Sequence, residues 1–268
     1  MGGLVKILRK WYTVLVCIFV DWRIAGMLKL QNVTKWYSKK ITPAVDYISL
    51  HVKPGEIFGF IGPNGAGKTT TIKMITGILD PSEGSISICG KDIVKEPVEA
   101  KRLFGYVPDN PDIYDRLTGI EYLQFLSDIY GVPGAERKAL ISKYAEMFGI
   151  QDALGNQIRS YSHGMRQKLV LIGALVHQPK LWIMDEPMVG LDPMAAHSLK
   201  EEMRKHCEKG NTVFFSTHVL EVAEKLCDRV GIIADGRLAA VGTMEELRQQ
   251  AGRDSSLEEI FLRTVEQK

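Results

Sequence analysis

A glycine-rich run that ends in a lysine and two threonines has the residue types needed to bind phosphate. The run Gly62-Pro63-Asn64-Gly65-Ala66-Gly67-Lys68-Thr69-Thr70 matches the pattern G-x-x-x-x-G-K-[ST]. Glycines let consecutive backbone N–H groups point at phosphate oxygens, and a helix that starts there adds favourable partial charge. We expect Lys68 to reach the β- and γ-phosphates of a nucleotide and the Thr69 hydroxyl to bind Mg²⁺. Taken alone, the motif would suit a GTPase, a kinase or a motor equally well.

Two adjacent carboxylates, Asp185 and Glu186, follow the apolar run Leu181–Met184. Such a run predicts a buried strand, and α/β sheets bind ligands at the carboxyl ends of their strands. Asp185 could hold Mg²⁺ through a water molecule. Because side chains alternate along a strand, we expect Glu186 to face the other side and to activate a water molecule as a general base. The pair therefore predicts nucleotide hydrolysis, against the alternative of an ordinary solvated strand end.

The phosphate loop and the two carboxylates can meet only if strands and helices alternate along the chain, as in an α/β fold with crossover helices. Apolar runs flanked by Gly, Pro or polar residues are typical of strands buried on both faces. Five such runs are candidate core strands: Ile57–Ile61, Tyr106–Val107, Leu181–Met184, Val213–Ser216 and Val230–Ile233. Between Asp112 and Val176 helical spacing replaces the strand pattern, which predicts a helical subdomain at about 112–176 inserted into the core.

The C-terminal part of the chain predicts two short helices. Thr243 and Ser255 are candidate N-caps, and Glu246 follows Thr243 at the spacing of a capping box. We therefore place the main domain at residues 27–245 and a helical tail at residues 246–268.

Composition excludes several classes of protein. The 268 residues, 45% of them apolar and 25% charged, suffice for one large core or a core with a subdomain. With 34 Lys and Arg against 32 Asp and Glu, the formal net charge is +2, so we expect no nucleic-acid partner. The four cysteines contain no C-x-x-C pair, which indicates free thiols in a reducing compartment and argues against a zinc site: Cys17, Cys89, Cys207 and Cys227.

Residues 1–26 differ in composition from the rest of the chain. Basic residues precede an apolar run of ten residues from Trp11 to Val20, about half the length needed to span a membrane. Three interpretations stay open: an upstream extension with Met27 as the functional start, an interfacial anchor helix and a signal peptide. Because export would separate a nucleotide site from its nucleotide, and no small-residue cleavage pattern follows Val20, the signal peptide ranks last.

About twenty residues before the two carboxylates, a segment resembles the signature of the ABC transporter ATPases: Tyr161-Ser162-His163-Gly164-Met165-Arg166-Gln167-Lys168. The family form is usually L-S-G-G-Q, and this chain keeps Ser162 and Gly164 in a variant similar to that of the ABC-2 type exporter ATPases. The Ser162 hydroxyl and the N-terminus of the following helix could together bind an anion, although alone they would indicate an ordinary N-cap. The resemblance implies that this second site closes on the γ-phosphate held by the opposite subunit.

The resemblance extends from about Leu28 to Leu262. It implies that Asp192, in Gly190-Leu191-Asp192-Pro193, meets the other subunit, and that His218 after Ser216-Thr217 reports the γ-phosphate. It also implies that an aromatic ring before the phosphate loop stacks on adenine. We prefer Tyr37 to its neighbour Trp36, which would face the opposite way along a strand.

One position departs from the family. In Gly105-Tyr106-Val107-Pro108-Asp109-Asn110, Asp109 stands where the family usually has Gln. That Gln is expected to offer its amide oxygen to Mg²⁺ and water, and to link the core with the helical subdomain. Aspartate keeps a hard oxygen ligand but is shorter and lacks the amide donor. We expect metal binding to survive while the coupling motion or the rate changes, with a weakened site as the alternative.

The resemblance implies a P-loop NTPase (RecA-like) α/β core with an antiparallel β region near the N-terminus and an inserted helical subdomain. It also implies an ATPase that uses ATP and Mg²⁺, with Lys68, Glu186 and His218 as catalytic residues. Such a subunit would act as a homodimer or heterodimer with a separately encoded transmembrane permease at the cytoplasmic face of the cell membrane. Export is favoured over import because Leu117–Leu123 and Leu257–Leu262 also resemble the ABC-2 exporter group.

Two alternatives from other functional classes remain. The first is a soluble ABC ATPase that acts on ribosomes or DNA, although such proteins usually have two cassettes in one chain or long inserted arms. The second is a regulatory module that hydrolyses little ATP, which Asp109 would suit and which the intact Lys68, Asp185, Glu186 and His218 argue against.

Overall fold

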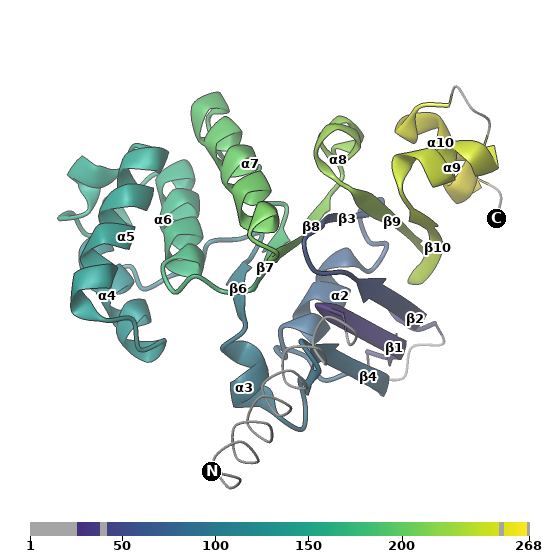
Figure 1. The fold of residues 1–268 in the computed structure, drawn as a ribbon, viewed down its shortest axis with the longest axis horizontal. Coiled ribbons are helices and arrows are strands. Elements are labelled where there is room, and N and C mark those ends of the chain that lie inside the picture. The colour runs from purple at the N-terminus through teal and green to yellow at the C-terminus, as the bar shows by residue number, and fades with distance from the viewer. Residues whose placement is uncertain (1–25, 38–41, 252–254, 267–268) are drawn as a thin grey trace, which may run out of the picture.

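The computed structural model describes residues 26–37, 42–251 and 255–266. It contains two sheets and a lobe of helices that lies between β6 and β7 in the chain and is attached to the larger sheet through these two strands (Figure 1). The N-terminal extension expected at residues 1–26 lies, except for Gly26, outside the described residues. Among the residues that are described, no helix is both long enough and apolar enough to cross a membrane.

Within the described residues, the larger sheet has six strands in the order β10-β9-β3-β8-β7-β6, all parallel except β10. Every residue of β3, β7 and β8 is buried, as expected of strands covered on both faces. The bounds are β3 Ile57–Ile61, β6 Phe104–Val107, β7 Leu181–Asp185, β8 Thr212–Thr217, β9 Arg229–Ala234 and β10 Arg237–Gly242. The five strands predicted from the sequence are therefore confirmed, with small differences at their ends.

The smaller sheet is antiparallel and has the order β2-β1-β4-β5. Helix α2 packs between the two sheets (Figure 1), and Ile72 and Ile75 of this helix share one core with Leu30, Ile86 and Phe58. The antiparallel region implied by the family resemblance is thus present. The bounds are β1 Leu28–Lys35, β2 Val45–Val52, α2 Lys68–Ile75, β4 Glu83–Ile88, β5 Lys91–Asp92 and α3 Pro97–Lys101.

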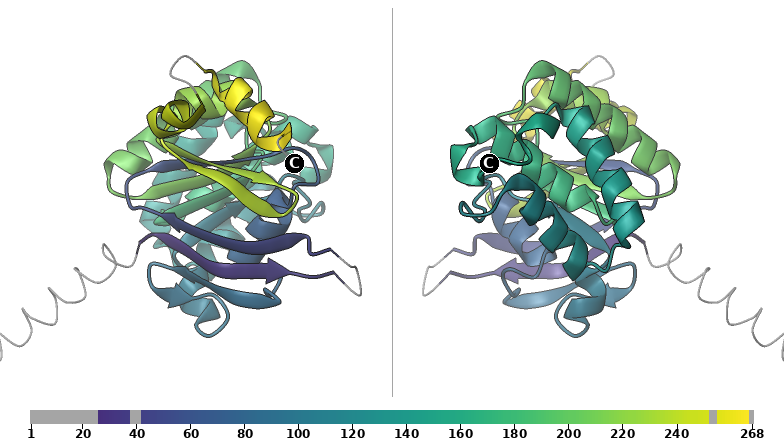
Figure 2. Two further views of the ribbon diagram at one scale, coloured as in Figure 1. Left: turned by 90° about the vertical axis from the view of Figure 1, so that its right-hand side faces the viewer. Right: turned by 90° about the vertical axis from the view of Figure 1, so that its left-hand side faces the viewer.

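The helical lobe consists of α4, α5 and α6 with two short 3-10 turns (Figures 1 and 2). Its apolar faces meet in a second core that includes Leu123, Tyr144, Phe148 and Leu169. The bounds are α4 Gly119–Ile129, α5 Gly134–Phe148 and α6 His163–Leu175. Helices thus occupy the region where the sequence shows helical spacing, whereas the status of residues 112–176 as a separate subdomain stays a prediction.

The remaining helices are α7, α8, α9 and α10, with bounds Pro193–Glu208, Leu220–Leu226, Met244–Ala251 and Leu257–Glu266. Thr243 caps α9 as predicted, since its hydroxyl accepts from the Glu246 N–H and its own N–H donates to the Glu246 carboxylate. The predicted cap of α10 is wrong by one residue. Helix α10 begins at Leu257, so the Ser256 hydroxyl, and not that of Ser255, accepts from the Glu259 N–H at 3.2 Å.

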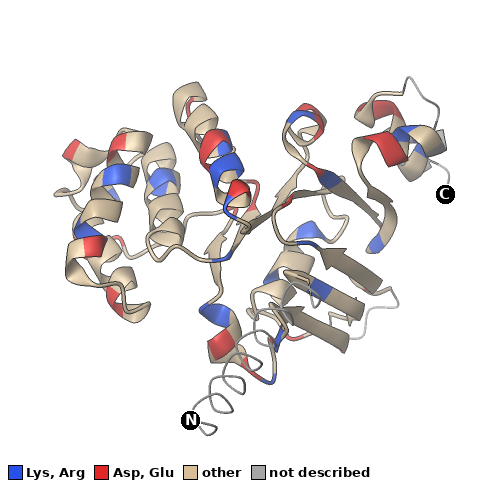
Figure 3. Ribbon diagram, in the orientation of Figure 1, with Lys and Arg blue, Asp and Glu red and all other residues tan. Residues whose placement is uncertain are grey.

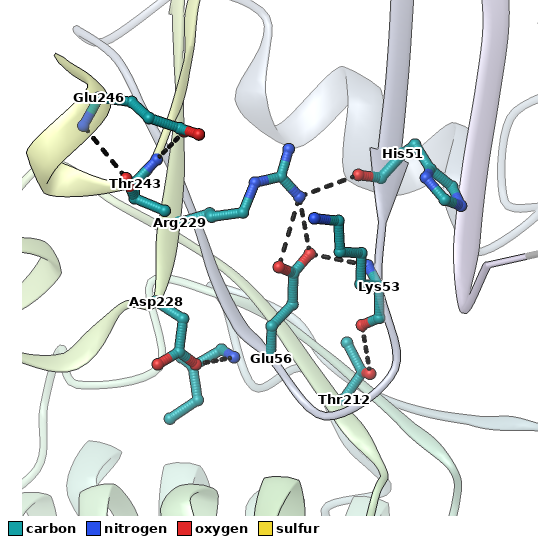
Figure 4. A network of polar contacts seen from close by, with 9 residues as sticks. His51, Lys53, Glu56, Thr212, Asp228, Arg229, Thr243 and Glu246 are labelled. Atoms are coloured by element: carbon teal, nitrogen blue, oxygen red, sulfur yellow. Dashed lines mark hydrogen bonds and ion pairs between the residues drawn. The ribbon is translucent and has the colours of Figure 1, made fainter. Parts of the chain in front are cut away.

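A network of hydrogen bonds and an ion pair lies at the amino ends of the parallel strands of the larger sheet (Figure 4). Arg229, at the start of β9, donates to the buried Glu56 at 3.0 Å and to the His51 carbonyl at 3.2 Å. The Lys53 N–H donates to the same carboxylate at 2.7 Å. A buried carboxylate is tolerated only when it is paired and hydrogen-bonded, so these contacts join the turn between β2 and β3 to the larger sheet. Elsewhere charges of both signs are mixed, for example along α7 (Figure 3).

Candidate active site

The phosphate loop connects β3 to α2 at the carboxyl end of the larger sheet. Gly67 precedes the helix with a left-handed φ of 108°, and a Cβ atom there would lie 2.7 Å from the Ala44 carbonyl oxygen. Only glycine therefore fits this turn without displacing a neighbouring strand. Next to the loop is a pocket of about 210 Å³, which is lined by Ala44, Asn64, Gly65, Gly67, Lys68, Thr69, Thr70, Asp109, Asp185 and Glu186.

Lys68 is the buried cation of this pocket. Its Nζ donates to the carbonyl oxygens of Gly62 at 2.7 Å and Pro63 at 3.2 Å. Burial lowers the pKa of Lys68, and the nearby carboxylates of Glu186, Asp185 and Asp109 oppose that shift. The ammonium group of Lys68 now donates to loop carbonyl oxygens. When a nucleotide binds, phosphate oxygens would take their place as acceptors.

Asp185 ends β7 and is the buried acid of the pocket. Its Oδ1 accepts from the Ser216 hydroxyl at 2.5 Å, whereas its buried Oδ2 has no hydrogen-bond partner within the described part of the chain. Burial raises the pKa of Asp185, and the hydroxyls of Ser216 and Thr69 oppose the shift. A cation beside Oδ2 would stabilise the ionised form and use the free oxygen.

This donor set fits Mg²⁺. Carboxylate and hydroxyl oxygens from Asp185 and Thr69 are hard ligands in one pocket. Among the described residues no three His, Cys, Asp or Glu side chains form a complete metal cage. Mg²⁺ is usually held by one or two protein oxygens together with waters and substrate phosphates, so the oxygens of Asp185 and Thr69 are of the kind that it binds.

Glu186 lies just outside β7, so the expectation based on alternating strand side chains is wrong. The chain turns into the left-handed region at this residue, with φ 50°, and the Glu186 N–H donates to the Ser216 hydroxyl at 3.1 Å and the Ser216 carbonyl at 3.3 Å. Its Oε1 lies 3.0 Å from Nδ1 of His218, and its Oε2 accepts from the His218 N–H at 3.4 Å. A left-handed glutamate is strained, and here the strain directs a carboxylate into the nucleotide pocket.

Asp109 lines the same pocket, two residues after β6 ends at Val107. Its charge acts on Lys68 and on Asp185, and with burial and Asp185 it helps to raise the pKa of Tyr106 to about 12. The structure therefore brings together the phosphate loop, Asp185, Glu186 and Asp109, as the sequence led us to expect.

The two aromatic candidates for adenine stacking lie at the edge of the site. Trp36 and Tyr37 are each 39% exposed. The Tyr37 hydroxyl lies 3.4 Å from Oγ1 of Thr70 on the phosphate-loop helix, and the backbone N–H of Trp36 donates to the Ser82 hydroxyl at 3.1 Å. Neither ring lines the pocket, so the preference for Tyr37 stays a prediction.

A second cluster contains Ser162, Gly164 and Asp192, none of which lines the pocket. Ser162 caps α6 by accepting from the Met165 N–H, and Asp192 caps α7 by accepting from the Ala195 N–H. The two helix starts are joined, since Lys168 on α6 forms an ion pair with Asp192. A Cβ atom on Gly164 would lie 2.6 Å from the Gly190 carbonyl oxygen, so the backbones are in close contact.

Ser216 and Lys168 are site residues that sequence reasoning did not assign. Ser216 pairs with Asp185 in the register of β7 and β8 and holds both carboxylate residues. The position of Ser216 could have indicated its role, because it stands two residues before His218 at the end of a predicted strand. The sequence does not indicate the role of Lys168, since its partner Asp192 lies in a distant loop.

Comparison with known proteins extends these observations. The model of the ABC transporter family matches residues 45–189. The linearmycin resistance ATP-binding protein LnrL of Bacillus subtilis is 39% identical over 232 residues, which cover 87% of this chain and 74% of that protein. The Nod factor export ATP-binding protein I of Burkholderia thailandensis is 38% identical over 220 residues, which cover 82% of this chain and 72% of that protein.

Solved structures share the fold. The structure of an ATP binding subunit of an ABC transporter has a TM-score of 0.85 and 35% identity, and the match covers 89% of this chain and 99% of that chain. A dimeric, post-hydrolysis structure of the ATP-binding cassette MJ0796, bound to ADP and Pi, has a TM-score of 0.73 and 26% identity. The match covers 81% of this chain and 99% of that chain. The similarity therefore includes both sheets and the helical lobe.

Proposed function

The chain belongs to the family of ABC transporter ATP-binding proteins. We propose that two such subunits close as a dimer when they bind ATP, and that this closure drives export through a separate membrane permease. Members of this family are ATP-binding subunits that dimerise and work with transmembrane permeases. The chain is an ATPase that uses ATP with Mg²⁺. The observation that carries the proposal is the pocket in which Lys68, Asp185 and Glu186 converge on the phosphate loop.

Each residue of that pocket has a role that its geometry supports. Lys68 and the loop N–H groups bind the β- and γ-phosphates. Thr69 and Asp185 would hold Mg²⁺, with Asp109 as a further oxygen, and the bound ion neutralises phosphate charge. Glu186 takes a proton from the attacking water as the bond to ADP breaks. The backbone N–H and ring of His218 hold the Glu186 carboxylate in place.

The second cluster acts across a dimer in this proposal. Ser162 and the start of α6 offer a hydroxyl and helix N–H groups outside the chain's own pocket. A second subunit could present its γ-phosphate to them, with Asp192 beside the contact. The dimeric state of the ADP- and Pi-bound cassette supports this arrangement. Homodimer and heterodimer satisfy it equally, because each nucleotide needs a pocket from one subunit and a signature from the other.

An exposed apolar surface that begins in the segment leading from the active site to α4 suits a permease. We call it the apolar hollow; it is lined by Tyr114, Asp115, Arg116, Leu117 and Phe125. Tyr114 is 63% exposed and Phe125 45% exposed, and their rings meet edge to face at 6.2 Å. The hollow begins five residues after Asp109, so a short segment of chain connects a protein seated there to the active site. Export is supported by the name of the Nod factor relative and by the ABC-2 type motifs.

Coexpression with the membrane protein encoded by the neighbouring gene tests the docking proposal. Phe125→Asp should abolish copurification and the stimulation of ATPase activity, because a charge in an apolar contact is poorly tolerated. Val98→Asp is the matched control, since Val98 on α3 is also exposed and lies outside the hollow. Equal effects of the two substitutions, or none, would refute docking at the hollow.

Direction is tested in inside-out membrane vesicles that carry the complex. Labelled candidate compounds should accumulate in the lumen only when ATP is added outside, because an exporter moves them away from the ATP-binding side. ATP-driven loss of a preloaded compound from the lumen would instead indicate import.

A further inference from the structure

The apolar hollow is continuous with the segment that carries Ser162. Residues 115–120 and 154–159 run side by side, held by backbone hydrogen bonds from Arg159 to Asp115, from Ile158 to Leu117 and from Ile120 to Leu154. Thr118 and Gln157 add an antiparallel bridge. The edge of the hollow and the approach to the signature helix are therefore one backbone unit.

One side chain extends that unit to the signature helix itself. Arg166, on the first turns of α6, places Nη1 2.7 Å from Oδ1 of Asp115. Its Nε donates to the Tyr161 carbonyl at 3.4 Å, immediately before Ser162. A single guanidinium thus bridges a residue that lines the hollow and the backbone next to the signature serine.

The residue before this serine is also anchored through its side chain. Tyr161 is buried, and its hydroxyl donates to the Ala153 carbonyl at 2.6 Å. The Ser162 hydroxyl is engaged as the N-cap of α6. With Tyr161 anchored in the lobe, the Asp115–Arg166 pair is a direct side-chain contact between the helix start and the lining of the hollow.

We infer that Asp115 and Arg166 are positioning residues that link the apolar hollow to Ser162. The inference deepens the proposed function and rests on it, because Ser162 acts on a nucleotide held by the opposite subunit. A protein that shifts Asp115 would move the start of α6 through the guanidinium, and closure of Ser162 on phosphate would move the hollow in return. Neither residue lines the nucleotide pocket, so nucleotide binding within one chain does not depend on the pair.

The test uses the full chain carrying Glu186→Gln, in which slow hydrolysis preserves an ATP-bound dimer. Dimer formation is measured by analytical ultracentrifugation over a range of ATP concentrations. Asp115→Arg and Arg166→Asp should each weaken dimer formation roughly three- to tenfold, because each replaces an ion pair by like charges and the dimer contains the link twice. The double substitution, which restores an ion pair with reversed polarity, should recover dimer formation to within about twofold.

A similar ion pair elsewhere in the lobe provides the control. Arg137 and Asp128 are paired, with side chains 23% and 66% exposed, close to the 24% and 54% of Arg166 and Asp115. Asp128→Arg and Arg137→Asp should leave the dimer midpoint unchanged. Binding of a fluorescent ATP analogue by the monomer and the melting temperature should stay the same for the Asp115 and Arg166 variants, because a half-exposed pair contributes little to stability.

Three outcomes are decisive. If Glu186→Gln alone forms no dimer with ATP, the proposed function fails. If it dimerises but the single Asp115 and Arg166 substitutions have no effect, the positioning role is refuted. If Arg166→Asp weakens the dimer and Asp115→Arg does not rescue it, Arg166 contacts the partner or its nucleotide directly, and the link to the hollow is again refuted.

Discussion

Replacing Gly164 by alanine tests the contact between the signature helix and the loop that leads to Asp192. A Cβ atom at Gly164 would lie 2.6 Å from the Gly190 carbonyl oxygen, whereas real Cβ contacts essentially never fall below 3.0 Å. Gly190 is itself in the left-handed region, with φ 79°. The two backbones must therefore separate.

Two opposing effects set the size of the change in stability. Alanine favours a helix over glycine by at most about 1 kcal/mol, and by less at a helix end. Overpacking a well-filled contact costs about 1–3 kcal/mol. The clash should dominate, with a net loss of roughly 1 kcal/mol and a fall in melting temperature of about 2–4 °C. Displacing Ser162 from the Asp192 loop should lower ATPase activity roughly tenfold, since 1 Å errors in position cost up to about a hundredfold.

Thermal unfolding, MgATP binding and steady-state ATPase activity check these expectations. MgATP binding by the monomer should be unchanged, because Gly164 does not line the pocket. Gly134→Ala is the matched control: Gly134 also starts a helix, and a Cβ atom there would meet nothing within 4 Å. This control should keep full activity and an equal or higher melting temperature. If Gly164→Ala behaves like the control, the close contact with Gly190 does not constrain the site.

Three further substitutions, the last with Arg204→Ala as its control, test the phosphate loop, Asp109 and the Arg229–Glu56 pair. Lys68→Ala should weaken MgATP binding at least about tenfold in equilibrium titrations, because a buried charge-assisted contact to phosphate is lost; unchanged affinity would exclude the loop as the nucleotide site. Asp109→Gln should retain ATPase activity within about threefold, as both side chains offer oxygen, and complete loss would show that the site requires the carboxylate. Arg229→Ala should lower the free energy of unfolding in urea by about 1–3 kcal/mol, since buried Glu56 loses its partner. Arg204→Ala, which breaks an exposed pair, should cost under about 1 kcal/mol.

Much of the fold could be predicted because its signals are local. The run Ile57–Ile61 is apolar, is followed by glycine and lies on a strand buried along its whole length. The capping box of Thr243 and Glu246 is also complete within four residues. At Ser255 and Ser256 local signals were ambiguous, because both can cap a helix. The start of α10 at Leu257 is set by packing, since Leu257 and Ile260 are buried in the core of the lobe and larger sheet.

The geometry at Glu186 could not be predicted in the same way. Its left-handed backbone is held by Ser216, which comes from the neighbouring strand β8, thirty residues further along the chain. Strand alternation correctly describes residues inside β7 and no longer applies one residue past its end. The pair of Lys168 and Asp192 likewise depends on how two helix starts meet in space. Contacts between segments that are distant in the sequence thus set the orientation of Glu186 and the position of Asp192, on which the proposed roles of these residues depend.

Whether Glu186 is the base of this ATPase is decided by measuring both MgATP binding and MgATP hydrolysis for Glu186→Gln. Glutamine keeps the size of the side chain and removes the proton acceptor, so we expect binding within about threefold of the unmodified chain and hydrolysis at least about a hundredfold slower. Glu201→Gln, on the exposed surface of α7, should change neither. Hydrolysis by Glu186→Gln near the rate of the unmodified chain would contradict the assignment of Glu186 as the base of this ATPase.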